Sequence, residues 1–278
     1  MASTGFGPGL TRHLLGCFLI LSLLGACEAP KRAASPQPMT AQFDAPAGSD
    51  PELVWQAARV ALPVRGSTSS LVTTMGAGVS PLVMAGGSPG TRWPVLLMLE
   101  GCSTPAPPRL LKALAEQGYV ALSLSSEARR HEPLACDPQK TLLENAAAIQ
   151  SQKGAELTFA LHALDRLNWV DPDHVFVLGF FEAGAAVARM KPAKTAGRVL
   201  IGWDCQGLST GGLRDTALSP VFSVSMMLAA AGRDCSGDMA DNTENRFLRL
   251  SESYSLNVLL EPIVFTQMLQ FLDRRLFR

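Results

Sequence analysis

The feature that most constrains the fold is an uninterrupted apolar run, Pro-Val-Leu-Leu-Met-Leu, at residues 94–99. A run this short without polar residues is typical of a β-strand that is buried on both faces, because a strand with one exposed face alternates apolar and polar residues. Strands of this kind belong to parallel sheets that are covered by helices on each side. The remainder of the chain should therefore supply connecting helices.

The segments on either side of this run alternate as a parallel sheet requires. The expected strands are Gln56–Val64, Pro81–Ala85, Pro94–Leu99, Tyr119–Leu124, Val175–Leu178, Arg198–Trp203, Pro220–Leu228 and Arg246–Leu250. The expected helices are Pro108–Gln117, a long helical region after Asp137-Pro138, Glu182–Met190 and Ile263–Arg278. The predicted fold class is α/β, with a mostly parallel central sheet flanked by helices on both faces.

Local signals place several of these boundaries. Gly118 follows the first helix in the position of a C-cap, and Pro138 suits the first turn of a helix capped by Asp137. His174 is expected to end the turn before Val175–Leu178. A core-facing stripe at helical spacing is predicted for Leu157, Leu161, Leu164 and Leu167.

The amino terminus indicates secretion. Arg12 and His13 precede an apolar run, Leu14–Ala26, which is too short to span a bilayer and has the features of a secretory signal. The run ends in Leu24-Gly25-Ala26-Cys27, which resembles a bacterial lipobox. That resemblance implies cleavage before Cys27 and lipidation of its thiol; an ordinary cleaved signal with a fortuitous cysteine is the alternative. We expect a lipid-anchored protein of the bacterial cell envelope, on the periplasmic or extracytoplasmic side.

The chain then divides into three parts. Residues 1–26 form the signal peptide, residues 27–50 a flexible tether rich in Pro, Ala, Ser and Gln, and residues 51–278 a single domain. Beyond the anchor, no second apolar segment is long enough to cross a membrane. The charges balance, at 24 Lys+Arg against 24 Asp+Glu without a basic stripe, which argues against nucleic-acid binding.

Four cysteines remain once Cys17 leaves with the signal and Cys27 is lipidated. An even number in an oxidising compartment predicts two disulfides, whereas a metal site would need ligand spacings that the sequence lacks. We therefore expect no metal and no cofactor. The disulfide candidates are Cys102, Cys136, Cys205 and Cys235.

Motifs at the ends of the expected strands resemble the dienelactone hydrolase-like branch of the α/β-hydrolases, over roughly Trp93 to Arg275. The matching segments are Leu-Glu-Gly-Cys-Ser at 99–103, Gly-Tyr-Val-Ala-Leu at 118–122, Leu-Gly-Phe-Phe-Glu-Ala-Gly at 178–184, Asp-Cys at 204–205 and Gly-Arg-Asp-Cys at 232–235. The resemblance implies an α/β-hydrolase fold with its site at the carboxyl ends of the strands.

The implied triad is degenerate. A nucleophile elbow needs small residues around a sharp strand-to-helix turn, and Gly179, Ala183 and Gly184 retain them. The nucleophile position itself is Phe181, whose ring cannot attack a carbonyl. A simple strand–helix turn of another α/β fold is the alternative interpretation.

The other triad positions also depart from the pattern. Asp234 matches the acid position, although it could equally cap a loop. No histidine follows His174, and Tyr254 lies nearest to the position where the histidine is expected. Tyrosine, with an ordinary pKa of about 10, is a poor general base at neutral pH.

The oxyanion region is altered as well. It corresponds to Glu100, Gly101 and Cys102, with Glu100 where the family often has histidine. A carboxylate there would oppose an oxyanion unless its side chain turned away. Of the three possible disulfide connectivities, we favour 102–136 with 205–235, each tying a loop over the vacated site. Cys102 acting as a nucleophile would need a nearby base, which the sequence does not provide.

Three functions follow from these residues. The first is a pseudoenzyme lipoprotein that binds a small ligand or an envelope protein. The second is an active carboxylic-ester hydrolase with a displaced nucleophile, and the third is a purely structural envelope lipoprotein. Serines near strand ends that could serve the second are Ser103, Ser223, Ser225 and Ser236.

Overall fold

The structure is a computed structural model of the 278-residue chain. It describes residues 48–64, 70–79, 90–102, 106–132, 142–190, 195–203, 220–226, 243–250 and 256–277. The chain divides into two compact units, Met1–Met39 and Thr40–Arg278, and every element described below belongs to the second.

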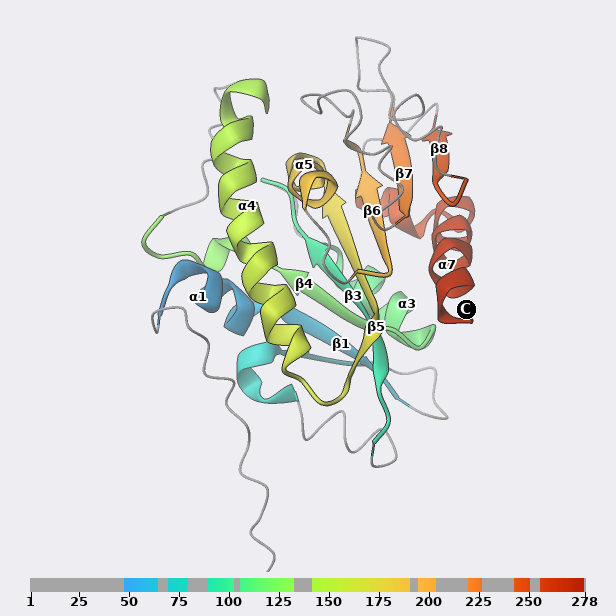
Figure 1. Ribbon diagram of the computed structural model, residues 1–278, viewed down its shortest axis with the longest axis horizontal. Coiled ribbons are helices and arrows are strands. Elements are labelled where there is room, and N and C mark those ends of the chain that lie inside the picture. The colour runs from blue at the N-terminus through green and yellow to red at the C-terminus, as the bar shows by residue number, and fades with distance from the viewer. Residues whose placement is uncertain are drawn as a thin grey trace, which may run out of the picture. The chain divides into compact units, whose positions relative to one another are not determined.

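A mixed sheet of eight strands forms the centre of this unit (Figure 1). The strands are β1 (Arg59–Pro63), β2 (Ser70–Thr74), β3 (Trp93–Leu99), β4 (Val120–Leu124), β5 (Val170–Phe180), β6 (Gly197–Ile201), β7 (Val221–Met226) and β8 (Arg246–Leu250). Their spatial order is β2-β1-β4-β3-β5-β6-β7-β8. β1 pairs antiparallel with both β2 and β4, and all the other pairs are parallel.

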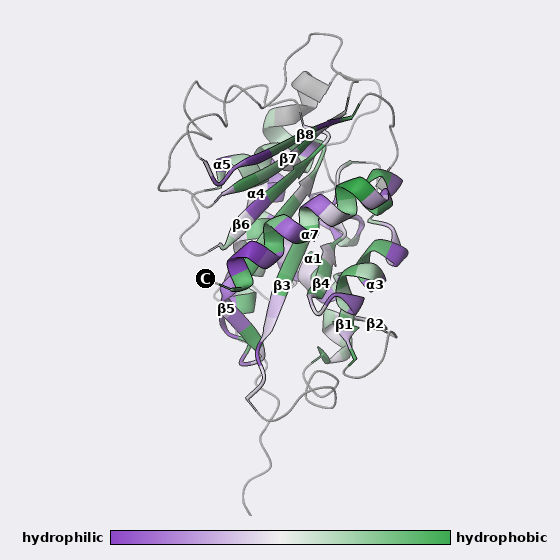
Figure 2. Ribbon diagram, turned by 90° about the vertical axis from the view of Figure 1, so that its right-hand side faces the viewer, coloured by the Kyte–Doolittle hydropathy of each residue, from purple (hydrophilic) through white to green (hydrophobic). Residues whose placement is uncertain are grey.

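Helices cover both faces of the sheet, as expected. They are α1 (Asp50–Ala57), α3 (Pro108–Glu116), α4 (Leu142–Asp165), α5 (Glu182–Arg189) and α7 (Pro262–Leu276). Helices α1, α4 and α5 share a hydrophobic core on one face, and α3 and α7 share a second core on the other. Figure 2 shows α7 crossing in front of the strands on that second face.

The central strand β3 divides its residues between the two cores with a period of two. Val95, Leu97 and Leu99 join the core of α1, α4 and α5, whereas Leu96 and Met98 join that of α3 and α7. All five side chains are fully buried. This is the physical reason that the run had no polar interruption, since a strand covered on both faces exposes neither set of side chains.

Most expected elements are confirmed within two residues of their predicted ends, but the first strand was predicted too early. Gln56 and Ala57 belong to helix α1, and β1 begins only at Arg59. Pro51 stands in the first turn of α1 beside the acidic Asp50 and Glu52, a combination that favours a helix amino terminus.

Strand β5 is longer than expected, and His174 lies within it rather than in a turn. Its pairing with β3 shifts register between Trp93↔Val170 and Val95↔Val175, so the polar residues between fall at an irregularity. The predicted core-facing stripe is confirmed, because Leu157 and Leu164 are buried and Leu161 and Leu167 pack, partly buried, against the same core. Helix α4 itself ends at Asp165, before Leu167. The strand predicted at Pro81–Ala85 and the cap at Asp137-Pro138 lie outside the described residues.

None of the helices that the structure describes is both long enough and apolar enough to cross a membrane.

Candidate functional site

The junction of β5 and α5 is a sharp strand-to-helix turn centred on Phe181. Phe181 has φ 47° and ψ −113°, and no other non-glycine residue in the described parts of the chain has a positive φ. Its N–H donates to the carbonyl of Ile201 over 2.8 Å, and its carbonyl accepts from Gly184 N over 2.9 Å. A bulky residue in this conformation is strained, and strain of this kind persists where the surrounding structure fixes it.

The small residues around Phe181 are required by close approach of the two elements. A Cβ at Gly179 would lie 2.8 Å from the carbonyl oxygen of Ala183, and a Cβ at Gly184 would lie 2.8 Å from the Cβ of Trp203. Neither space can hold a side chain. The turn therefore has a sharp strand–turn–helix geometry, with closely packed small residues on both sides of Phe181.

Glu100, which we expected to affect an oxyanion, is turned away and fully engaged. Its Oε1 accepts hydrogen bonds from Ser123 Oγ at 2.5 Å, Arg59 Nη2 at 2.6 Å and the backbone N–H of Ala106 at 3.0 Å. Its side chain is 5% exposed. The guanidinium of Arg59 compensates its charge, so Glu100 ties β3 to β1 and β4.

A different carboxylate, that of Glu182, lies against the Gly101–Cys102 turn. The backbone N–H of Cys102 donates to Glu182 Oε2 over 3.2 Å. A Cβ at Gly101 would lie 2.9 Å from the same oxygen, so this position accepts only glycine without displacing the carboxylate. In a serine hydrolase of this fold, N–H groups of this loop and of the residue after the nucleophile form the oxyanion hole. Here Glu182, the residue directly after Phe181, carries the carboxylate.

Sequence reasoning missed the role of Glu182, although a signal was present. An acidic residue directly after Phe181 can place its side chain toward the loop after β3, because β3 and β5 are neighbours with Leu99 opposite Gly179. The remaining predicted positions Asp234 and Tyr254 lie outside the described residues.

The three histidines of the domain serve elsewhere. His174 Nδ1 lies 2.7 Å from Asp171 Oδ2, and its Nε2 lies 2.9 Å from the carbonyl oxygen of Arg275. His131 Nδ1 lies 3.1 Å from Asp50 Oδ1. His162 is exposed on α4. Among the described residues, the hydrogen bonds of His131 and His174 lead to partners away from the Phe181 turn, whereas a general base for that turn would have to lie beside it.

Two of the four serines considered as displaced nucleophiles, Ser223 and Ser225, lie in the described residues, and their burial does not suit that role. Ser223 is fully buried in β7, and its Oγ has no hydrogen-bond partner among the described residues. Ser225 follows on the same strand and is also buried. An activated serine needs a base within hydrogen-bond reach and access to substrate. Ser103 and Ser236 lie outside the described residues.

Cys102 is a disulfide-bonded cysteine. The other three candidates, Cys136, Cys205 and Cys235, lie outside the described residues, so the pairing stays a prediction.

A buried ionic cluster connects α4 to the segment after β4. Lys153 Nζ donates to Ser126 Oγ over 2.5 Å and lies 3.6 Å from Glu156 Oε2. Glu156 also accepts from Ser126 Oγ at 2.7 Å and from Arg129 Nη1 at 2.9 Å. Burial lowers the pKa of Lys153, while Glu156 and Glu100 oppose that shift.

A serine beside a lysine of lowered pKa can form a nucleophile–base pair, but this pair is internal. Lys153 is fully buried, and Ser126 is 6% exposed. The hydroxyl of Ser126 donates a hydrogen bond to Glu156 and accepts one from Lys153, so it is engaged on both sides. The cluster therefore stabilises the packing of α4 and offers no site for a substrate. Within the parts of the chain that the structure describes, no group of three His, Cys, Asp or Glu residues is placed to hold a metal ion.

The fold matches solved structures at low sequence identity. A chain named m3DLH matches with a TM-score of 0.51 and 15% identity, over 67% of this chain and 88% of its own. A protein assigned as a dienelactone hydrolase from Klebsiella pneumoniae subsp. pneumoniae MGH 78578 gives 0.48 and 13%, over 78% and 98%. A thermophilic esterase from Thermogutta terrifontis gives 0.45 and 12%, over 79% and 88%.

The match to m3DLH, together with the order of the strands and the helices on both faces of the sheet, shows the fold of the chain. It is an α/β-hydrolase fold built on an eight-stranded, mostly parallel sheet. No protein-family model matches the sequence, and no curated protein matches it either. The fold is thus shown by structure, and function depends on the site.

Proposed function

We propose that this chain is a lipid-anchored envelope protein whose α/β-hydrolase domain is a pseudoenzyme that binds a ligand or a partner protein. The observation that carries the loss of catalysis is Phe181, which occupies the strained turn where a hydrolase of this fold presents its nucleophile. A phenyl ring has no lone pair or acidic proton for acyl transfer. In a serine triad, loss of the nucleophile alone costs on the order of a million-fold in turnover.

The surroundings of Phe181 support the same proposal. The amide of Cys102 already donates to Glu182, so a negative charge lies where a hydrolase gathers donors for an oxyanion. No histidine follows His174 in the sequence to act as the base. Restoring catalysis would therefore require changes at three separate positions.

Membrane attachment rests on the Leu24-Gly25-Ala26-Cys27 sequence. We propose that Cys27 is acylated and holds the domain at the extracytoplasmic side of a bacterial membrane. A cysteine that carries more than one acyl chain anchors a protein stably in a membrane, whereas a single acyl chain gives only marginal membrane binding.

The catalytic part of the proposal is tested by active-site labelling of the full chain with a fluorophosphonate probe. We expect no serine to be labelled, and no saturable hydrolysis of p-nitrophenyl acetate or butyrate above a heat-denatured sample. An active dienelactone hydrolase-type enzyme serves as the positive control. Labelling of a specific serine together with saturable turnover would refute the pseudoenzyme assignment.

The anchor is tested separately by metabolic labelling of the chain with radioactive palmitate in a bacterial host. The Cys27→Ser variant should lose the label, whereas Cys17→Ser should keep it. Equal labelling of both variants, or none of the unmodified chain, would contradict acylation at Cys27.

A further inference from the structure

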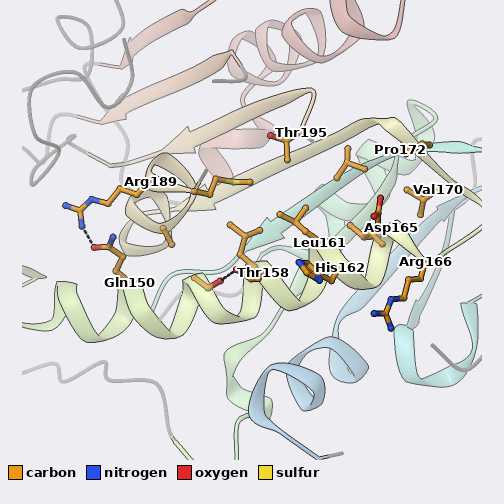
Figure 3. Close-up of a pocket in the computed structure, with 16 residues that line it drawn as sticks. Gln150, Thr158, Leu161, His162, Asp165, Arg166, Val170, Pro172, Arg189 and Thr195 are labelled. Atoms are coloured by element: carbon orange, nitrogen blue, oxygen red, sulfur yellow. Dashed lines mark hydrogen bonds between the residues drawn. The ribbon is translucent and has the colours of Figure 1, made fainter. Parts of the chain in front are cut away.

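A groove of about 650 Å³ lies between α4, the first part of β5 and the end of α5, toward the opposite end of β5 from Phe181. Figure 3 shows it running along α4, with Gln150 and Arg189 at one end and Asp165 and Arg166 at the other. We propose that this groove binds a single-chain amphiphile, with an apolar chain along α4 and an anionic head group at Arg189.

The shape of the groove follows from two adjacent stripes on α4. One stripe, which includes Lys153, Leu157 and Leu164, is buried against the core, and its two leucines also border the groove. The second is displaced by one position, at Gln150, Gly154, Leu161 and Asp165, and lines the groove. Residues 150 and 165 are about 22 Å apart at the helical rise of 1.5 Å per residue. An elongated ligand fits this dimension.

The floor of the groove is apolar. Val170 and Val175 of β5 form part of it and are buried, while Leu161 of α4 and Met190 after α5 are only partly covered. Ligand pockets commonly have volumes of roughly 300–1,000 Å³, apolar walls and a few polar groups that orient the ligand. This floor can bury methylene groups, which is the main source of affinity for an acyl chain.

Gly154 supplies a second observation. It lies within the 24-residue helix α4, where glycine is an unfavourable choice. A Cβ at this position would meet nothing within 4 Å, so no packing within the protein demands glycine there. The missing side chain leaves the helix backbone open to whatever lies in the groove.

Charge selects the end and the sign of the head group. At one end, the acidic Asp165 and the basic Arg166 both line the groove, so this end carries both signs of charge. At the other end, the guanidinium of Arg189 donates a hydrogen bond to Oε1 of Gln150 at the end of the groove. A guanidinium can donate two parallel hydrogen bonds to a carboxylate or phosphate. The Arg189 end therefore favours an anionic head group.

The proposal is tested by calorimetric titration of the full chain carrying Cys27→Ser, which removes any covalently attached acyl competitor. The probes are decanoate and decyltrimethylammonium, both below their micelle concentrations. Decanoate should bind saturably at one site, and octanoate should bind roughly fifteen-fold more weakly because it buries two fewer methylene groups. Absence of saturable decanoate binding would overturn the proposal.

Variants then locate the site. Gly154→Leu fills the groove and improves the helix propensity of α4, so it should fold and weaken decanoate binding at least tenfold. Ala148→Leu adds the same side chain at an exposed position of α4 and should change binding less than twofold. Arg189→Glu should weaken decanoate at least fivefold without weakening decyltrimethylammonium. Equal effects of the two leucine variants, or equal binding of both head groups in every variant, would contradict the site or its charge preference.

Discussion

The backbone N–H of Cys102 and the carboxylate of Glu182 are joined by a 3.2 Å hydrogen bond between the turn after β3 and the first residue of α5. The two turns are adjacent because β3 and β5 pair in parallel up to Leu99↔Gly179. The N–H of Cys102 therefore holds the two turns together. In a hydrolase of this fold, an N–H group of this loop stabilises negative charge in the transition state. Glu182, the residue directly after Phe181, carries a negative charge that would repel a developing oxyanion.

This arrangement predicts that installing a serine does not create an esterase. Phe181→Ser should show no turnover of p-nitrophenyl acetate above buffer, and Phe181→Ser/Glu182→Ala should show none either, because no histidine is placed to accept the proton. The assay is hydrolysis at neutral pH, with fluorophosphonate labelling as a second readout. Saturable turnover by either variant would mean that an unrecognised base lies nearby.

Backbone strain at Phe181 predicts that a glycine variant is more stable than an alanine variant at this position, the reverse of their usual order within a helix. Because φ is 47°, Phe181→Gly should be more stable than Phe181→Ala by about 1 kcal/mol. For a domain of this size, that difference corresponds to roughly 2–4 °C in melting temperature. Ala185→Gly in α5 is the matched control, and it should show the ordinary order, with glycine less stable. An alanine variant at 181 that melts at or above the glycine variant would argue against strain.

The buried cluster on α4 predicts unequal effects of neutralising its members. Glu156→Gln removes the carboxylate that contacts both Lys153 and Arg129, although Arg129 keeps its contact with Asp50, and should lower the free energy of unfolding by about 3–5 kcal/mol. Lys153→Met leaves the Arg129–Glu156 pair intact and should cost less. Urea denaturation of both variants measures the difference. A larger loss for Lys153→Met would contradict this account of the cluster.

The carboxylate of Asp50 predicts a loss of stability in acid. Burial would raise its pKa, but the backbone N–H groups of His131, Arg130 and Glu132 and the His131 ring hold the pKa well below its usual range. A depressed folded pKa stabilises the protein above the unfolded value, and this contribution is lost as the pH falls below about 4. Denaturation at pH 7 and pH 3 should show a smaller acid-induced loss for Asp50→Asn than for the unmodified chain. Equal losses would contradict the assignment.

The parts of the fold that could be predicted from sequence were those in which the residue types of one segment indicate whether it is buried or where it ends. The apolar run at 94–99 had to be buried on both faces, and Gly118, with φ 91°, marked the end of α3. Helix α1 was missed because its strongest signals, Asp50 and Pro51, lay at the edge of a segment that composition assigned to a tether.

The contacts of the site could not be predicted in the same way, because they join residues distant in sequence. Glu100 and Arg59 are 41 residues apart, and Ser126 and Lys153 are 27 apart. Nothing in the local pattern around Lys153 distinguishes it from an exposed lysine on a helix. Only the packing of α4 against the segment after β4 decides that its ammonium is buried.

The bonds of Asp50 also define how the domain would respond to a mechanical load. Asp50 accepts from the N–H groups of residues 130–132 and lies 3.7 Å from Arg129, which in turn contacts Glu156 of α4. Tension applied through the chain before Gly48 would enter the domain at this clamp and spread into α4. Helix α4 packs in turn against α5, which begins directly after Phe181, so such tension would reach the helix that fixes this turn.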